Sequence, residues 1–173
     1  MKRNERITYK TTSFLALFRI YRFRTLIFNF SFLIAAVLSA SFYFFYKDIN
    51  TTNQIVNFVG TTLSSISASL LGIVIAGLAI LIALTQGKTL SILLQRNVLQ
   101  IFLFPFWILS FFWGISTLIC IAIIFLDIIN FNYLFYLITF EVFIFTYSVL
   151  STIQLMGHAI RLGLFLADYE NDS

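Results

Sequence analysis

The hydrophobic and polar positions of this chain divide it into long apolar runs separated by short polar connections. Four runs cover approximately residues 26–46, 62–85, 106–126 and 133–156, and each reaches the roughly 20 residues that cross the hydrocarbon core of a bilayer as a helix. Their residues do not alternate as barrel strands do, and only helices or closed barrels satisfy the backbone in lipid. The pattern predicts an all-α membrane protein, a four-transmembrane-helix bundle in a single integral membrane domain.

Two further segments have the spacing of amphipathic helices. Residues 13–24 predict an N-terminal helix lying at the membrane interface, with a straight extension of the first span as the alternative. Residues 89–100 predict a half-buried helix between the second and third spans. The third span is expected to begin near Pro105, because proline is tolerated in the first turn of a helix and disfavoured further inside. The basic side chains expected at the membrane surface are Lys10, Arg19, Arg22 and Arg24.

The composition leaves no room for a soluble domain. Of the 173 residues, 60% are hydrophobic and 10% are charged, whereas soluble proteins carry about 25% charged residues. The net charge is +4, and all of the 11 Lys and Arg residues except Lys47 precede the first run, lie between the second and third, or follow the fourth. Such residues mark cytoplasmic segments, so the sequence predicts both termini in the cytoplasm and two short outer connections, near residues 47–61 and 127–132. The charge is a topology signal, and direct binding to nucleic acid is not expected.

The most unusual position is Glu141, which lies inside the fourth run, roughly 12 Å from its outer end at 1.5 Å per residue. An acid in lipid is costly unless it is protonated, paired or hydrated, and such residues are candidate functional sites. Ser148 and Thr152 share its helix face, while Ser39 and Ser69 lie at a comparable depth on the first two spans. We expect these hydroxyls or a neighbouring subunit to be its partners, and its carboxyl group to be neutral. Two interpretations stay open: an ion-, proton- or signal-sensitive site, and a hydrogen bond that only joins helices.

The second run has a face of small residues, in which Ala68, Gly72 and Ala76 recur at every fourth position. Small side chains let helix backbones approach closely in lipid, where packing rather than hydrophobicity drives association. The sequence therefore predicts that the second span is a central contact, either within the bundle or between the subunits of a homo-oligomer.

No arrangement in the sequence predicts catalysis. It contains no nucleophile with an adjacent base, no phosphate-binding loop and no pair of carboxylates outside the apolar runs. His158 and Cys120 are each the single residue of their kind, and a metal site needs several ligands. We therefore expect neither an enzyme nor a cofactor or metal site.

The size of the chain, its four apolar runs, its basic start and the run Leu70–Ala79 (LLGIVIAGLA) give it a recognisable layout. This layout resembles small four-span membrane proteins of bacterial anti-phage defence, such as the membrane component of the Kiwa system and the four-span accessory protein of type VI CRISPR loci. The resemblance implies an oligomeric protein of the bacterial inner membrane that senses infection or membrane disturbance and works with a cytosolic partner.

Two functions follow as hypotheses. The first is a membrane sensor or anchor that recruits or regulates a cytosolic effector, which the short outer connections and larger inner surface favour. The alternative is a pore- or ion-channel-type effector, which Glu141 and the serine-rich start of the second run favour. A small-molecule exporter is expected to show polar residues along a path and internal symmetry, and the sequence has neither.

Overall fold

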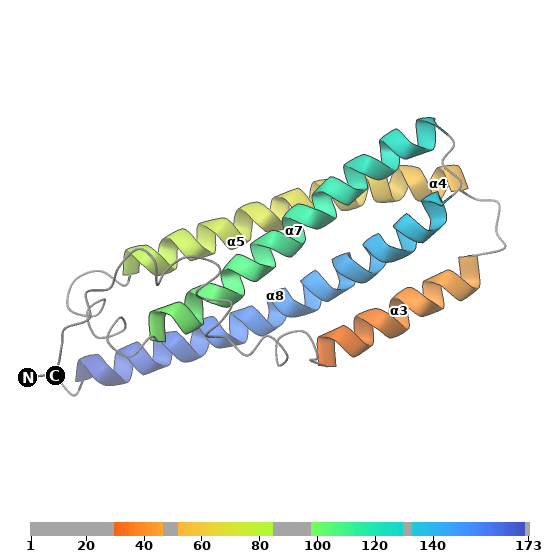
Figure 1. The fold of residues 1–173 in the computed structure, drawn as a ribbon. Helices are drawn as coiled ribbons and strands as arrows, with labels where there is room; N and C mark the ends of the chain where they lie inside the picture. Colours follow the sequence, from red (N-terminus) through yellow and green to blue (C-terminus); the bar gives the residue numbers. More distant parts are fainter. Residues whose placement is uncertain (1–29, 47–51, 85–97, 130–132, 172–173) are drawn as a thin grey trace, which may run out of the picture.

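The computed structural model describes residues 30–46, 52–84, 98–129 and 133–171, and every regular element in these ranges is helical. The all-α prediction is therefore confirmed for this part of the chain. The elements are α3 (Phe30–Tyr46), α4 (Thr52–Asn57), the π-helix η2 (Phe58–Leu63), α5 (Ser64–Leu84), α7 (Val98–Ile128) and α8 (Leu134–Asn171) (Figure 1).

Two predicted amphipathic helices cannot be followed in the structure. The interfacial helix of residues 13–24 lies outside the described residues, together with the basic side chains Lys10, Arg19, Arg22 and Arg24. Most of the segment 89–100 lies outside them too, and its last three residues belong to α7.

Three helical stretches are long and apolar enough to cross a membrane: Gln54–Ala83, Leu103–Ile128 and Leu134–Arg161. They correspond to the second, third and fourth predicted spans. The helix α3 is also apolar, but its 17 residues extend for only about 26 Å. A hydrocarbon core is roughly 30 Å thick, and the predicted first span begins at residue 26, outside the described residues. The count of four spans therefore stays a prediction.

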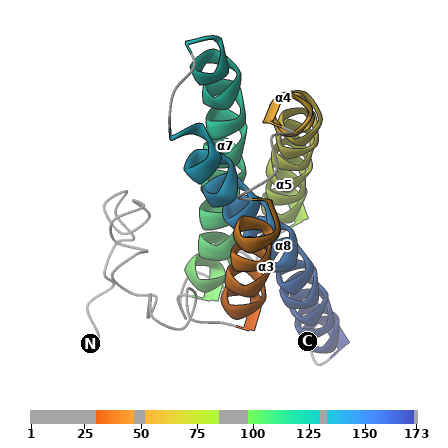
Figure 2. The same ribbon diagram turned by 90° about the vertical axis from the view of Figure 1, so that its right-hand side faces the viewer.

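The helices pack as an open row in the order α5, α7, α8, α3 (Figure 1). Figure 2 shows the same arrangement from the end at which α3 finishes and α4 begins. Two hydrogen bonds hold α3 on α8, one at the start of α3 and one near its middle. Ser39 Oγ donates to the Thr139 carbonyl oxygen at 2.9 Å, and Gln154 Nε2 donates to Ser31 Oγ at 2.8 Å. The helix α3 therefore lies at one edge of the row, and α5 lies at the opposite edge.

The second span begins earlier than the sequence predicts, which corrects the expected outer connection of residues 47–61. Residues 52–63 are rich in Thr and Asn, a composition typical of loops, yet they form α4 and η2. Val56, Val59 and Leu63 recur on one face of this segment and are buried in a core with α7 and α8. Burial of that apolar face explains why the segment is helical despite its polar residues.

A close helix approach lies within η2. A Cβ atom added to Gly60 would collide with the side chain of Ile124 on α7, 2.9 Å from its Cδ1 atom, and would lie 3.7 Å from the carbonyl oxygen of Cys120. Glycine therefore lets η2 approach the backbone of α7, as small residues commonly do between membrane helices. The wider π turn occurs at this contact.

The third and fourth helices also exceed their predicted bounds. The helix α7 begins at Val98 and contains Pro105 in its interior, while its apolar stretch begins at Leu103, close to the span start predicted near this proline. Proline there deprives one carbonyl of its usual backbone donor. The helix α8 continues beyond the predicted residue 156 to Asn171, and its 38 residues extend for about 57 Å.

Candidate intramembrane polar site

The helices α5, α7 and α8 each contribute one polar side chain to a buried cluster, which we call the polar layer (Ser67, Ser116 and Glu141). All three side chains are 0% exposed. Ser116 donates a hydrogen bond to Glu141 Oε1, and its Oγ atom lies 2.9 Å from Ser67 Oγ. One acid thus ties together three helices through two serine hydroxyls.

The direction of these bonds follows from the hydrogens available. A serine hydroxyl has a single hydrogen, so Ser67 donates to Ser116 when Ser116 donates to Glu141. If the carboxyl group carries a proton on the bonded oxygen, both bonds reverse without moving a heavy atom. The same geometry can therefore hold Glu141 in either protonation state.

The polar layer separates two apolar cores. On one side lie Val56, Val59, Leu63, Cys120, Ile123, Leu134 and Ile138, and on the other lie Val74, Phe106, Leu109, Trp113 and Leu155. Each of the three helices passes from one core through the polar layer to the other. A layer of this kind fixes the vertical register of the helices, because sliding one helix would bury its polar side chain against apolar neighbours.

Glu141 is not fully satisfied by its neighbours. Its Oε1 atom accepts the hydrogen bond from Ser116. The second carboxyl oxygen, Oε2, has no hydrogen-bond partner among the described residues. Leaving a buried polar atom unpaired costs about 1–3 kcal/mol. The polar layer therefore combines a specific contact with a local destabilisation.

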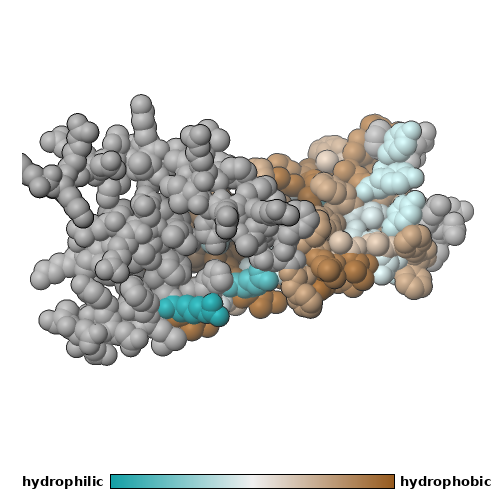
Figure 3. Space-filling view, turned by 60° about the horizontal axis from the view of Figure 1, so that its bottom comes forward, coloured by the Kyte–Doolittle hydropathy of each residue, from teal (hydrophilic) through white to brown (hydrophobic). Residues whose placement is uncertain are grey.

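An aromatic cluster marks the depth of the polar layer. The Tyr43 and Tyr136 rings are 6.0 Å apart, and the Tyr133 and Tyr136 rings are 6.2 Å apart. Tyrosine concentrates at the interface between membrane and water. In the space-filling view, residues of intermediate hydropathy gather at one end of the apolar surface (Figure 3). Glu141 lies five residues beyond Tyr136, which places it about 8 Å deeper along the helix.

The remaining members of the predicted site form separate contacts. Ser148 is buried, but its Oγ atom has no partner among the described residues. Thr152 donates to the Ser148 carbonyl and accepts a bond of 3.2 Å from Trp113 Nε1. The ring of Phe145 packs edge-on against Trp113 at 5.5 Å. Ser148 and Thr152 thus share a helix face with Glu141, as predicted, and Thr152 reaches a different residue of α7.

Two serines predicted to accompany Glu141 do not bond to it. Ser69 is exposed and donates to the Ser65 carbonyl of its own helix at 2.8 Å. Ser39 is buried and contacts α8, but it bonds to the Thr139 backbone. The direct partner is Ser116, and the serine of α5 in the polar layer is Ser67. The sequence contains a signal for Ser67, since it continues the spacing of Leu63 and Val74.

Span three also carries Ser110 and Thr117, and both bond to carbonyls of their own helix, those of Phe106 and Trp113. Ser116 instead points its hydroxyl toward α5 and α8. Nothing in the sequence alone distinguishes these hydroxyl residues, because the choice depends on the rotation of α7 against its neighbours.

The small-residue face of α5 (Ala68, Gly72 and Ala76) lies on the exposed side of the helix. A Cβ atom added to Gly72 would meet nothing within 4 Å. The described part of the protomer therefore leaves this face uncovered, and both predicted uses of the face, within the bundle or between subunits, stay predictions.

Within the described residues, no group of three or more His, Cys, Asp or Glu side chains comes together as a metal site would require. No family model, curated protein or solved structure is significantly similar to the chain.

Proposed function

We propose that this protein is an oligomeric membrane sensor or anchor that passes a signal from the polar layer along α8 to a cytosolic effector. The observation that carries the proposal is the continuity of α8, since one helix holds Glu141 and continues to Asn171. A rigid helix can transmit a rotation or shift imposed at one end to the other.

The length of α8 supports a projection beyond the bilayer. Tyr136 and the exposed Arg161 are about 38 Å apart along the helix, close to the roughly 40–45 Å of a bilayer with its headgroups. The residues from Arg161 to Asn171 add about 15 Å on the side of Arg161. This segment offers a helical surface to a partner on that side.

The excess of basic residues makes that side the cytoplasm. In this arrangement α3 belongs to the first of four spans, both termini face the cytoplasm, and the membrane is the bacterial inner membrane. A cysteine at Asn53→Cys should react with an impermeant reagent added from outside, while one at Lys88→Cys should not. The reverse pattern would contradict the topology and the direction of the proposed signal.

The resemblance to small four-span defence proteins supports a role in anti-phage defence, in which infection or membrane disturbance is the trigger. The uncovered small-residue face supports a homo-oligomer. A partner in the cytoplasm is expected because the connections predicted on the other side are short.

A pore- or ion-channel-type effector is the second candidate, and the buried acid favours it. Glu141 is 0% exposed, so it lines no path through the described part of a single protomer, and a conducting path would have to form between copies. Conductance of the purified protein in planar bilayers, altered by Glu141→Gln, would favour this candidate.

Transmission along α8 can be measured directly. Spin labels at the exposed positions Phe111→Cys and Gly163→Cys report the distance between α7 and the far part of α8, and Cys120 is buried and so protected from labelling. We expect Glu141→Gln to shift this distance distribution in vesicles, whereas Phe140→Leu, an exposed neighbour, should leave it unchanged. An identical distribution in all three proteins would contradict the proposal.

A further inference from the structure

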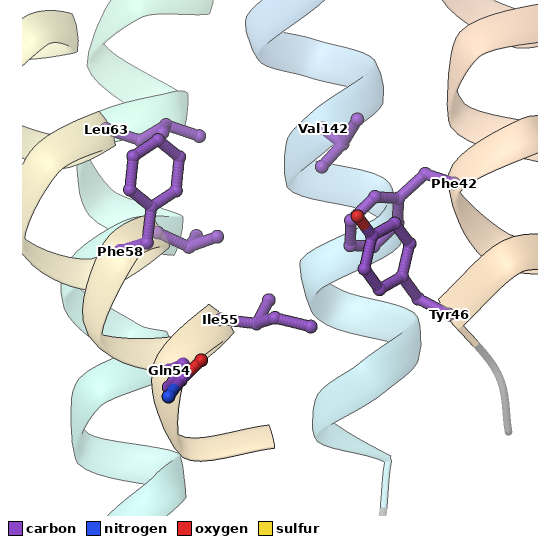
Figure 4. Close-up of a pocket in the computed structure, with 8 residues that line it drawn as sticks. Phe42, Tyr46, Gln54, Ile55, Phe58, Leu63 and Val142 are labelled. Carbon is purple, nitrogen blue, oxygen red and sulfur yellow. The ribbon is translucent and has the colours of Figure 1, made fainter. Parts of the chain in front are cut away.

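A groove opens between α3 and the segment formed by α4 and η2, near the end of the molecule that carries the tyrosine cluster (Figure 4). Its volume is about 290 Å³. Phe42 and Tyr46 form the wall on α3, with their rings stacked at 4.9 Å. Val142, the residue after Glu141, lies at the floor on α8.

The opposite wall comes from the π-helix. Phe58, Val59 and Leu63 of η2 line the groove, together with Ile55 and Gln54 of α4. Phe58 and Leu63 are five residues apart, and a π turn closes at that spacing, so both side chains fall on the same side of the helix. Single π turns inside α-helices are frequent at functional sites. The unusual local structure and the groove thus coincide.

The polarity of the groove suits an amphiphile. Leu63 and Val142 form an apolar end, and Gln54 lies at the other end, whereas the Tyr46 hydroxyl points toward Val142 rather than toward Gln54 (Figure 4). No charged side chain is among the described residues that line the groove. A ligand that fits this lining has an uncharged apolar chain and a hydrogen-bonding group at Gln54.

The size of the groove suits part of an acyl chain. An engineered apolar cavity of about 150 Å³ holds one benzene molecule, so this groove accommodates roughly twice that volume. Its walls belong to the helices at the two edges of the row, and Phe58 is 57% exposed, so the described residues leave the groove open at the side.

We propose that this groove binds one acyl chain of a membrane phospholipid, with the glycerol region of the lipid at Gln54. The bound chain separates α3 from η2 and contacts α8 next to the polar layer. The groove and its occupant do not depend on whether the protein passes a signal to an effector.

The test uses the full chain in vesicles of phosphatidylethanolamine that include a fraction with a photoactivatable diazirine on the acyl chain. After irradiation, mass spectrometry maps the labelled residues. We expect label on Leu63 and Val142 well above the label on Leu118, a lipid-facing residue that is 66% exposed on α7.

A matched pair of substitutions separates the groove from the general lipid surface. Val142→Phe fills the floor and should abolish labelling of the buried Leu63 while leaving Leu118 labelled. Val37→Phe makes the same change at a position on α3 that is 56% exposed and outside the groove, and it should change nothing. Phe58→Ala truncates a largely exposed side chain and should increase the label on Leu63.

Three results would overturn the proposal. Equal labelling of groove residues and Leu118 in every variant would mean contact with bulk lipid only. A cross-link from the groove to a second copy of the chain would assign the groove to an oligomer contact. A cross-link to the N-terminal segment of the same chain would assign it to that segment.

Discussion

The continuous helix from Thr52 to Leu84 has two faces built from small and hydroxyl residues, and the rest of the protomer uses them differently. On the covered face, Gly60 lies against Ile124 and Ser67 belongs to the polar layer. On the open face, a Cβ atom added to Gly72 would meet nothing within 4 Å among the described residues, and Ser69 bonds to its own helix. Residue type is the same on both faces, so the neighbouring apolar residues decide which face packs.

The covered face follows the apolar stripe of the helix. Val56, Leu63 and Val74 are buried, and Gly60 and Ser67 continue the same three- and four-residue spacing. The open face lies off this stripe, so the protomer gains nothing by covering it. A small or polar residue on the stripe therefore serves the fold of one protomer, and one off the stripe is free for contacts between copies.

Replacement of the glycine on each face should give the largest difference in stability between the two faces. Gly60→Ala should destabilise the protein by about 1–3 kcal/mol, because the added methyl group overpacks the contact with Ile124. Gly72→Ala, which meets open space, should cost nothing. Unfolding of the purified protein in detergent, followed through the fluorescence of the buried Trp113, measures both.

A second substitution checks the cause of this loss. Ile124→Ala combined with Gly60→Ala should recover part of the lost stability, because it removes the atoms that the new methyl group meets. Equal stability of Gly60→Ala and Gly72→Ala would show that η2 does not need a close approach to α7.

Substitution of Glu141 in the polar layer should give the next largest loss of stability. Glu141→Leu removes the acceptor for Ser116 and should cost about 0.6–2 kcal/mol, the range of hydrogen bonds between membrane helices. Glu141→Gln retains an oxygen acceptor of similar shape, so it should unfold within experimental error of the parent. If both variants unfold like the parent, the bond from Ser116 to Glu141 contributes nothing to stability.

The sequence predicts the helical class, the three long spans and the burial problem posed by Glu141, because these depend on composition over about 20 residues. It also predicts the small-residue face, since a spacing of four is visible without a structure. The start of the second span is missed, because local composition suggests a loop and only tertiary burial of Val56 and Val59 overrides it.

The partners of Glu141 show where sequence reasoning ends. Depth along a span selects Ser39 and Ser69 as candidates, but a hydrogen bond also needs the correct rotation of each helix. Ser67 and Ser69 differ by two positions, which is about 200° around a helix, so only one of them can face α7. Ser116 can be identified as the partner of Glu141 only when the packing of α7 on α8 is known.

The matched serines of α5 should show a smaller effect. Ser67→Ala removes a buried bond to Ser116 and should cost about 0.6 kcal/mol, the average for hydrogen bonds between membrane helices. Ser69→Ala removes only a bond to its own backbone at an exposed position, and should be neutral. The same unfolding measurement compares them, and a greater loss at Ser69 would place the covered face on the wrong side of the helix.

Substitutions on the open face should have the smallest effect on the stability of the protomer, but they should change the assembly of an oligomer. Gly72→Leu adds a large side chain where the described protomer has no neighbour, so unfolding of the monomer should be unchanged.

In an oligomer that packs through this face, the same leucine would hold two backbones apart. Light scattering of the detergent-extracted protein should then show smaller species than the parent. Ile66→Phe, a bulky change at a residue that is 41% exposed on a different side of α5, is the control for added bulk. An unchanged oligomer in Gly72→Leu would mean that copies of the chain meet through another surface.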